Sequence, residues 1–194
     1  MKGGVALWPN FALPLTEFLS IRKPHALSAT RFTVDGKTKA EIRILSSFIK
    51  RKVKSSNKKF AKVRDIWTAE DFRGDLVDAE LDRHHAVKSA EEAGALAMEY
   101  EVNRIQDFNT ADFLYFKNFV RISKAAEWRQ NRGKPVRLNQ HRECWYFGNV
   151  DDGETVLAHV RREGDACTTL LFDRDQRRLF VSRATAPEVT TKPR

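Results

Sequence analysis

The sequence contains little cysteine and no clustered metal ligands. Its 194 residues include two cysteines, Cys144 and Cys167, and five histidines that lie scattered along the chain. A disulfide framework needs more cysteines, and a structural zinc site needs ligands at short spacing, such as two cysteines separated by two residues. We therefore expect two buried free thiols and no metal site.

No stretch of the sequence is apolar for long enough to cross a bilayer. A spanning helix requires about 20 predominantly apolar residues, whereas the opening segment, residues 1–19, is interrupted by Pro9 and Pro14. With 41% hydrophobic and 31% charged residues, the composition is typical of a globular protein. We expect a soluble, cytoplasmic chain with no membrane partner.

The chain is basic, with a formal net charge of +9. Such a charge favours anionic partners: nucleic acid, a membrane surface, a phosphorylated cofactor or an acidic protein. Eight cations fall within residues 50–64, which gives this segment the charge to contact phosphates. No platform of stacking aromatic side chains is interleaved with them. A solvated hairpin is therefore the favoured interpretation, and nucleic-acid binding is the weaker alternative.

The first region of the chain reads as an antiparallel β meander. Asp35 and Gly36, where residues 26–36 meet residues 37–51, form the dipeptide best suited to a tight hairpin turn. Apolar and charged side chains alternate along the second arm with the period of a strand. Residues 58–67 read as a further strand.

Residues 68–98 have a different composition, which is acidic at first and alanine-rich later. This composition favours helix and connector, and residues 89–92 suit the start of a short helix. We expect a helical linker on which His84 and His85 are exposed.

The third region predicts one strand, one long helix and four further strands. Residues 99–105 read as a strand, and residues 113–130 carry apolar side chains in almost every direction around a helical axis, which predicts a helix covered on all sides. An antiparallel sheet that curls around the helix provides that cover. The four strands are expected at residues 137–149, 154–162, 166–173 and 177–186.

Several side chains of these regions are expected in the core. They are Trp67, Phe116, Phe119, Trp128 and Trp145. We place His141 and Arg142 on the surface of the sheet.

The order of elements in the third region resembles the hot-dog fold, in which a sheet wraps a central helix. The stretch DFNTADFLYFKNF, residues 107–119, resembles the turn that opens this helix in thioesterases of the fold. A closer resemblance is to the double hot-dog acyltransferase/decarboxylases of polyketide-type biosynthesis, the family of the leinamycin-pathway enzyme. The motifs that carry it are Phe108-Asn109-Thr110, Leu114-Tyr115-Phe116, Tyr146-Phe147-Gly148-Asn149 and Asp152-Gly153-Glu154.

The resemblance implies an α+β chain with tandem hot-dog repeats, of which the first is incomplete. We expect a partial repeat of strands without a central helix at 1–67, a helical linker at 68–98, a complete repeat at 99–186 and a tail at 187–194. The first repeat is interpreted as truncated or degenerate. A homodimer or a hetero-oligomer would then cover its exposed apolar surface.

The resemblance also implies that an acyl thioester reaches the start of the central helix. Free N–H groups and the helix dipole stabilise an oxyanion there. The substrate is expected to be acyl-CoA or acyl carrier protein, whose phosphopantetheine carries the acyl group, with no further cofactor. The candidate catalytic residues are Asn109 and Tyr115, and the candidate substrate-binding residues are Asp107, Asp112, Asn57 and Lys58.

Each of the main candidates has a structural alternative. Asn109 stands where thioesterases of the fold carry a catalytic carboxylate, and an amide orients a thioester or water but is no base; it is also among the best helix caps. Asp107 suits an Asx turn, and Tyr115 suits the core. Asp112 stands where the family pattern has glycine, so its side chain and charge would narrow the approach of an acyl group.

We expect a protein directed at acyl thioesters, with acyl transfer, with or without decarboxylation, as the preferred activity. One alternative is a non-catalytic hot-dog module that binds an acyl ligand or completes another subunit. The weakest alternative is nucleic-acid binding through residues 50–64.

Overall fold

The structure is a computed structural model and describes residues 14–63, 70–90, 92–132 and 141–185. Trp67 and the tail at 187–194 lie outside these ranges. The elements are β1 (Leu15–Arg22), β2 (His25–Val34), β3 (Lys37–Ser47), β4 (Ile49–Val53), β5 (Ser56–Lys62), α1 (Gly74–Ala90), β6 (Ala95–Glu101), α2 (Arg104–Asp107), α3 (Phe116–Gln130), β7 (His141–Tyr146), β8 (Thr155–Glu163), β9 (Ala166–Phe172) and β10 (Arg178–Thr185).

The chain divides into two compact units. One contains residues 1–50 and 61–83, and the other contains residues 51–60 and 84–194. The assignment of these parts to two hot-dog repeats stays a prediction. No helix in the described ranges combines the length and the apolar character that crossing a membrane requires.

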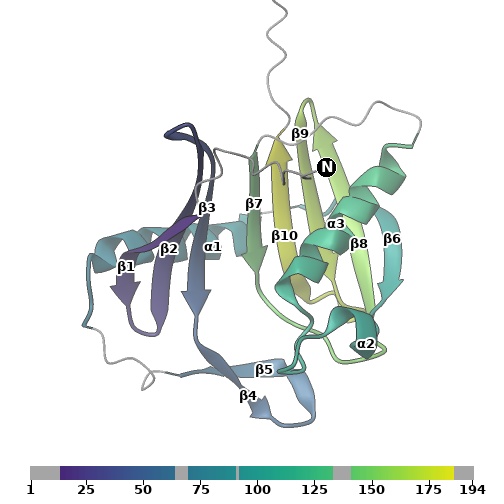
Figure 1. The fold of residues 1–194 in the computed structure, drawn as a ribbon. Helices are drawn as coiled ribbons and strands as arrows, with labels where there is room; N and C mark the ends of the chain where they lie inside the picture. The colour runs from purple at the N-terminus through teal and green to yellow at the C-terminus, as the bar shows by residue number, and fades with distance from the viewer. Residues whose placement is uncertain (1–13, 64–69, 91, 133–140, 186–194) are drawn as a thin grey trace, which may run out of the picture. The chain divides into compact units, whose positions relative to one another are not determined.

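The first unit contains an antiparallel sheet in the order β1-β2-β3 (Figure 1). Asp35 and Gly36 have positive φ values of 51° and 71° and form the predicted hairpin turn between β2 and β3. Ile42 and Ile44 alternate with charged residues along β3, as predicted. They are nevertheless 49% and 47% exposed, so this alternation does not mark a covered face.

The basic segment folds as the hairpin of β4 and β5, which form a two-stranded sheet. The hairpin interpretation is therefore confirmed. Strand β5 begins at Ser56, two residues before the predicted strand, so the candidate residue Asn57 lies within it.

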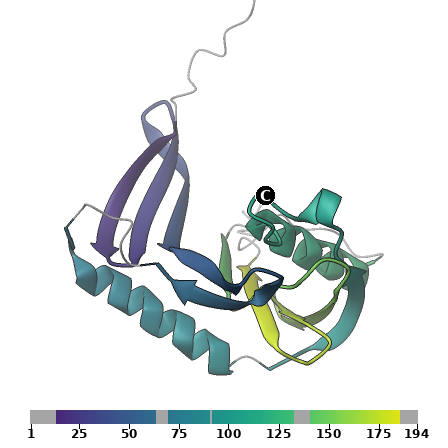
Figure 2. The same ribbon diagram turned by 90° about the horizontal axis from the view of Figure 1, so that it is seen from below.

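Helix α1 is one continuous helix of 17 residues, drawn in Figure 2 without a break. Its first turn contains Asp75 and its last turn contains Lys88, which suits the helix dipole at both ends. The prediction that a short helix starts at Ser89 is therefore wrong, because Ser89 lies in the last turn. His85 is exposed as predicted, but His84 is partly buried and its Nε2 lies 3.0 Å from the carbonyl oxygen of Tyr146.

The second unit contains an antiparallel sheet in the order β6-β8-β9-β10-β7, with α3 against one face (Figure 1). Gly153 and Gly164, at the predicted turns that flank β8, have positive φ values of 76° and 59°. The core between helix and sheet includes Phe119, Ile122 and Phe180. An α+β unit with an antiparallel sheet on a central helix is thus confirmed.

The sheet covers one face of α3 rather than its whole circumference. Phe119 and Ile122 are 2% and 0% exposed, whereas Phe116 and Trp128 are 55% and 54% exposed. The expectation that Phe116 and Trp128 lie in the core is wrong, while Trp145 is buried as predicted. The helix has the ordinary spacing of three and four residues between buried positions.

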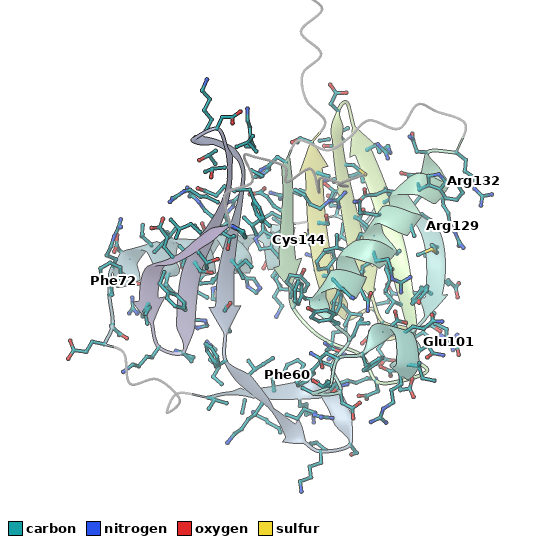
Figure 3. All side chains as sticks on the ribbon, viewed as in Figure 1. Phe60, Phe72, Glu101, Arg129, Arg132 and Cys144 are labelled. Atoms are coloured by element: carbon teal, nitrogen blue, oxygen red, sulfur yellow. The ribbon has the colours of Figure 1, made fainter. Side chains whose placement is uncertain are left out.

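A polar cluster lies between the C-terminal half of α3 and the sheet. The Arg142 side chain points to Glu127 of α3 and is only 15% exposed, so its expected place on the open sheet surface is wrong. Cys144 on β7 (Figure 3) and Cys167 lie nearby as free thiols. Burial raises the pKa of both thiols, which keeps them protonated at neutral pH.

Candidate functional site

The entrance loop, residues 107–115, leads into α3 and is closed by Asn109. The Oδ1 atom of Asn109 accepts the N–H groups of Ala111 and Phe113, each at 3.0 Å. Its own backbone N–H donates to the Phe113 carbonyl at 2.9 Å. These bonds hold Phe113 outside the helix, which explains why α3 begins at Phe116 and not at the predicted Phe113.

Asp107 anchors this loop from inside. Its carboxylate is 0% exposed and accepts hydrogen bonds from the Tyr100 hydroxyl (2.9 Å), the Asn103 N–H (2.9 Å) and Arg121 (2.5 Å). Its backbone carbonyl accepts a further bond from the Asn118 amide at 2.8 Å. Because the carboxylate is fully buried and accepts three hydrogen bonds from its surroundings, Asp107 serves the loop as a structural residue.

Asp112 adopts a left-handed backbone conformation, with a φ of 63°. Glycine enters this region without steric cost, and other residues do so at a penalty. The family pattern has glycine at this position, so the departure noted in the sequence coincides with a strained residue. The Asp112 carboxylate also forms an ion pair with Arg104.

Two buried amides hold the entrance loop from outside. Asn149 accepts the Leu114 N–H at 3.0 Å and donates to the Leu114 carbonyl at 3.2 Å, as a neighbouring strand would. Asn57 donates to the carbonyls of Asp112 (2.6 Å) and Val150 (3.2 Å). The Asn57 Oδ1 atom is buried and has no hydrogen-bond partner in the described part of the chain. The Tyr-Phe-Gly-Asn motif therefore ends in the residue that positions the start of the central helix.

A cavity of about 300 Å³ lies beside the entrance loop. Two cations, Arg51 and Lys54, reach it from the β4–β5 hairpin, and Arg104 reaches it from α2. Arg51 is held in place, because it donates to the Ala111 carbonyl at 2.8 Å and lies 5.3 Å from the centre of the Phe113 ring. The described residues that line it are Arg51, Lys54, Ser55, Asn57, Arg104, Phe108, Asp112, Asp151 and Asp152.

The charges of this cavity are partly neutralised within the protein. Arg104 pairs with Asp112, and Asp151 accepts bonds from the Ser56 hydroxyl (3.0 Å) and the Asn57 N–H (2.6 Å). None of the ion pairs among the described residues involves Lys54, which lines the cavity. Within the described ranges, no set of three His, Cys, Asp or Glu side chains is arranged to hold a metal ion.

Comparison with known proteins gives a fold and no family. No family model matches the sequence, and no curated protein matches it. Among solved structures, the chain is similar to an acyl-ACP thioesterase from Bacteroides thetaiotaomicron VPI-5482, with a TM-score of 0.56, 9% identity, and coverage of 89% of this chain and 67% of that one. It also matches thioesterase superfamily member 2 from Mus musculus, with a TM-score of 0.41, 12% identity, and coverage of 58% and 91%.

The chain has the hot-dog fold. At this level of identity the likeness shows the fold alone, and membership of the double hot-dog acyltransferase/decarboxylases stays a prediction.

The hot-dog unit brings together two of the six candidate site residues, because Asn57 and Asp112 both line the cavity. Tyr115 is the N-cap residue of α3 without a capping side-chain hydrogen bond, and its ring packs 4.5 Å from that of Phe116. Lys58 lies in a second cavity of about 250 Å³ and pairs with Glu154 at 2.5 Å, a bond that raises the pKa of Lys58. Asn109, Tyr115, Asp107 and Lys58 do not line the first cavity.

Sequence reasoning missed Arg51, Arg104 and Asp151 as residues of this hot-dog site. Arg51 was one of eight cations in a segment assigned to solvent, and nothing local distinguishes it from its neighbours. The Phe113 ring packs on the Arg51 guanidinium and lies 5.7 Å from the ring of Phe60, which is labelled in Figure 3. An aromatic side chain within the polar entrance loop was therefore the sequence feature that indicated a packing partner at this site.

Proposed function

We propose that this hot-dog protein binds an acyl thioester of CoA or of acyl carrier protein at the start of α3 and transfers its acyl group. The supporting observation is that Phe108 and Asp112 of the entrance loop form part of the wall of the 300 Å³ cavity, directly before a helix without a side-chain cap. The first N–H groups of a helix lack intrahelical partners. In this position they are suited to bind a carbonyl oxygen that becomes negative during acyl transfer.

The cations beside the loop suit the anionic part of such a substrate. CoA and the prosthetic group of acyl carrier protein carry phosphates, which arginine and lysine bind through charge-assisted hydrogen bonds. Lys54 has no described carboxylate partner, and Arg51 presents its guanidinium at the same rim. The solved structure with the TM-score of 0.56 is an acyl-ACP thioesterase, which supports acyl carrier protein as a substrate to test.

The hydrogen bonds donated to the Asp107 carboxylate favour acyl transfer over hydrolysis. A hydrolase of this kind needs a base for water, but the Asp107 carboxylate is occupied by three donors and Asn109 has no group that titrates. In transfer, an acceptor nucleophile forms a bond to the acyl carbon, the thioester C–S bond breaks, and the released thiol takes the nucleophile's proton. Loss of CO₂ from a malonyl or methylmalonyl group is a separate step that the same assay detects.

A non-catalytic acyl-binding module is the second candidate. It is favoured by the fact that the Asn109 Oδ1 atom is used to close its own loop. An acyl group would then bind without turnover.

The test is a panel of acyl-CoA and acyl-carrier-protein thioesters, malonyl and methylmalonyl included, followed by intact-mass detection. Because Asn109 closes the loop that places Asp112 in the cavity wall, we expect Asn109→Ala to displace the site and to reduce transfer by about 10- to 1000-fold. The lost cap should cost about 1 kcal/mol of stability. Asn103→Ala is the matched control, because Asn103 caps α2 with an equivalent bond to the Ile105 N–H and lies outside the entrance loop. Binding without turnover would favour the module, and no binding of any thioester would refute both.

Nucleic-acid binding through residues 50–64 is the weakest of the three proposals. Arg51 and Lys58, two of the eight cations, are already engaged by the Ala111 carbonyl and by Glu154. We expect no sequence-selective DNA or RNA binding at physiological salt, since the remaining charges give only salt-sensitive attraction. A submicromolar specific complex in fluorescence anisotropy at that salt would reverse this ranking.

A further inference from the structure

Lys54 lines the 300 Å³ cavity from the turn of the β4–β5 hairpin. Strand β4 ends at Val53 and β5 begins at Ser56, so Lys54 is the first of the two residues that connect these strands. The Arg51 guanidinium donates to the Lys54 carbonyl at 3.4 Å and to the Ala111 carbonyl of the entrance loop at 2.8 Å. One side chain therefore ties the hairpin turn to the entrance loop, and the Lys54 amine extends from this fixed point on a flexible four-carbon chain.

Lys54 differs from the other lysines of the hairpin in its surroundings. Lys58 forms an ion pair with Glu154 at 2.5 Å, and this bond raises the pKa of Lys58 and keeps the proton on its amine. Lys52 is exposed on the same hairpin but is not among the described residues of the cavity wall. None of the ion pairs among the described residues involves Lys54. It is therefore the lysine of this hairpin that is best placed to act as a nucleophile in the cavity.

An acyl thioester bound in this cavity lies beside the Lys54 amine. The cavity volume of about 300 Å³ is at the small end of the range for ligand pockets. Its wall contains Lys54 together with Phe108 and Asp112 of the entrance loop, the part of the site to which we assign the acyl carbonyl. Holding an amine and a carbonyl together in one small site raises the rate at which they react.

We propose that Lys54 accepts the acyl group of a bound thioester and becomes N-acylated. This inference rests on the proposed function, because it requires an acyl thioester at the start of α3. The ammonium group first gives one proton to solvent. The nitrogen electron pair then forms a bond to the acyl carbon, the thioester C–S bond breaks, and the released thiolate takes a second proton from the nitrogen. The products are an amide at Lys54 and a free thiol.

The modification closes the site that produces it. Acylation of Lys54 removes a cation from the cavity wall and leaves the acyl group attached beside the entrance loop. An amide is far less reactive than a thioester, so the acyl group stays on Lys54 and is not passed on. An excess of acyl thioester therefore lowers the number of chains that can bind it, which makes Lys54 a regulatory site.

Peptide mapping by mass spectrometry after incubation with acetyl-CoA, or with acetylated acyl carrier protein, tests the proposal. Lys52 is the matched control. We expect acetylation of Lys54 to be at least about 10-fold faster than that of Lys52. The rate at Lys54 should saturate with rising donor concentration, because the reaction starts from a bound complex, whereas the rate at Lys52 should rise in proportion. Lys54→Arg keeps the positive charge and should abolish acetylation at this position, and Lys52→Arg should leave acetylation of Lys54 unchanged.

A binding measurement separates failure of this inference from failure of the proposed function. The probes are S-ethyl-CoA and acyl carrier protein with an S-ethyl group, thioethers that have no acyl group to transfer, and calorimetry measures their binding. If either probe binds while Lys54 and Lys52 are acetylated at equal rates, the inference is overturned and the proposed function stands. If neither probe binds and acetylation of Lys54 does not saturate, both are overturned.

Discussion

Arg142 of β7 and Glu127 of α3 form an ion pair with two parallel hydrogen bonds beneath the central helix. The two Arg142 Nη atoms lie 2.9 and 2.8 Å from the Glu127 oxygens, and their side chains are 15% and 10% exposed. Thr169 donates to Glu127 at 3.0 Å, and Arg142 donates to the Ser182 hydroxyl at 2.6 Å. Helix and sheet are therefore joined by a satisfied polar link as well as by apolar packing.

Removing one partner of this ion pair should lower the free energy of unfolding. Arg142→Met leaves the Glu127 carboxylate buried without its partner, and we expect a loss of about 3–5 kcal/mol in the free energy of unfolding. The double variant Arg142→Met/Glu127→Leu removes both charges and should lose less than Arg142→Met alone. Urea denaturation of wild type, Arg142→Met, Glu127→Leu and the double variant gives the four free energies of the cycle, and losses that simply add would show that the pair does not act as a unit.

The two phenylalanines at the start of α3 should differ sharply. Phe119→Ala removes a ring that is 2% exposed, and we expect a loss of about 3–5 kcal/mol in the free energy of unfolding. Phe116 is 55% exposed, so Phe116→Ala should cost less than about 1 kcal/mol. Equal losses in denaturant melts would contradict the one-sided burial of the helix.

Replacing Asp112 tests the strain in the entrance loop. Asp112→Gly removes the strain of a left-handed backbone conformation, which is about 1–2 kcal/mol. It also removes an exposed ion pair that contributes about 0–1 kcal/mol. The melting temperature should therefore stay the same or rise. Acyl-CoA binding should tighten, because a charge and a side chain leave the cavity wall. Asp112→Ala is the control, since it loses the ion pair but keeps the strain, and it should melt lower than wild type. A lower melting temperature for Asp112→Gly than for Asp112→Ala would rule out the strain argument.

His84 should make stability depend on pH. Burial against Phe147, with ring centres 4.5 Å apart, lowers the pKa of His84 in the folded state. The unfolded chain, with a histidine pKa of about 6.5, then binds the proton more readily. The stability contributed by neutral His84 is therefore present above that pH and is lost as the pH falls through it.

The measurement is urea denaturation between pH 8 and pH 5 of wild type, His84→Gln and the exposed control His85→Gln. The advantage of wild type over His84→Gln should shrink below about pH 6.5. A constant difference across the range would show that the His84 environment does not disfavour its charged form.

Local sequence patterns predicted which helices and strands occur in the second unit more accurately than they predicted where those elements begin and end. The gaps left between the predicted strands at 149–154 and 162–166 contain Gly153 and Gly164, which adopt positive φ values there because glycine does so without steric cost. The start of α3 was misplaced because Phe113, Leu114 and Tyr115 are apolar enough for a helix. Phe113 is held outside it by Asn109, and Leu114 is held outside it by the remote amide of Asn149.

The same limit applies to single side chains. The sequence around Arg142 does not tell which face of β7 is covered, and its partner Glu127 lies 15 positions away on another element. Of the candidates that lie near one another in the sequence, only Asp112 lines the cavity, and the cations beside it come from the β4–β5 hairpin and α2.

The two amides that hold the entrance loop have a consequence for the order of folding. Asn109 closes its own turn over two and four residues, whereas Asn149 reaches back 35 positions to Leu114 and Asn57 reaches forward 55 positions to Asp112. Closing longer loops costs more chain entropy. We expect the turn to form early and to gain its fixed position only when the strands on both sides have assembled. A ligand that contacts this loop would then bind only to fully folded molecules. Its binding would therefore report the fraction of chains that have completed folding.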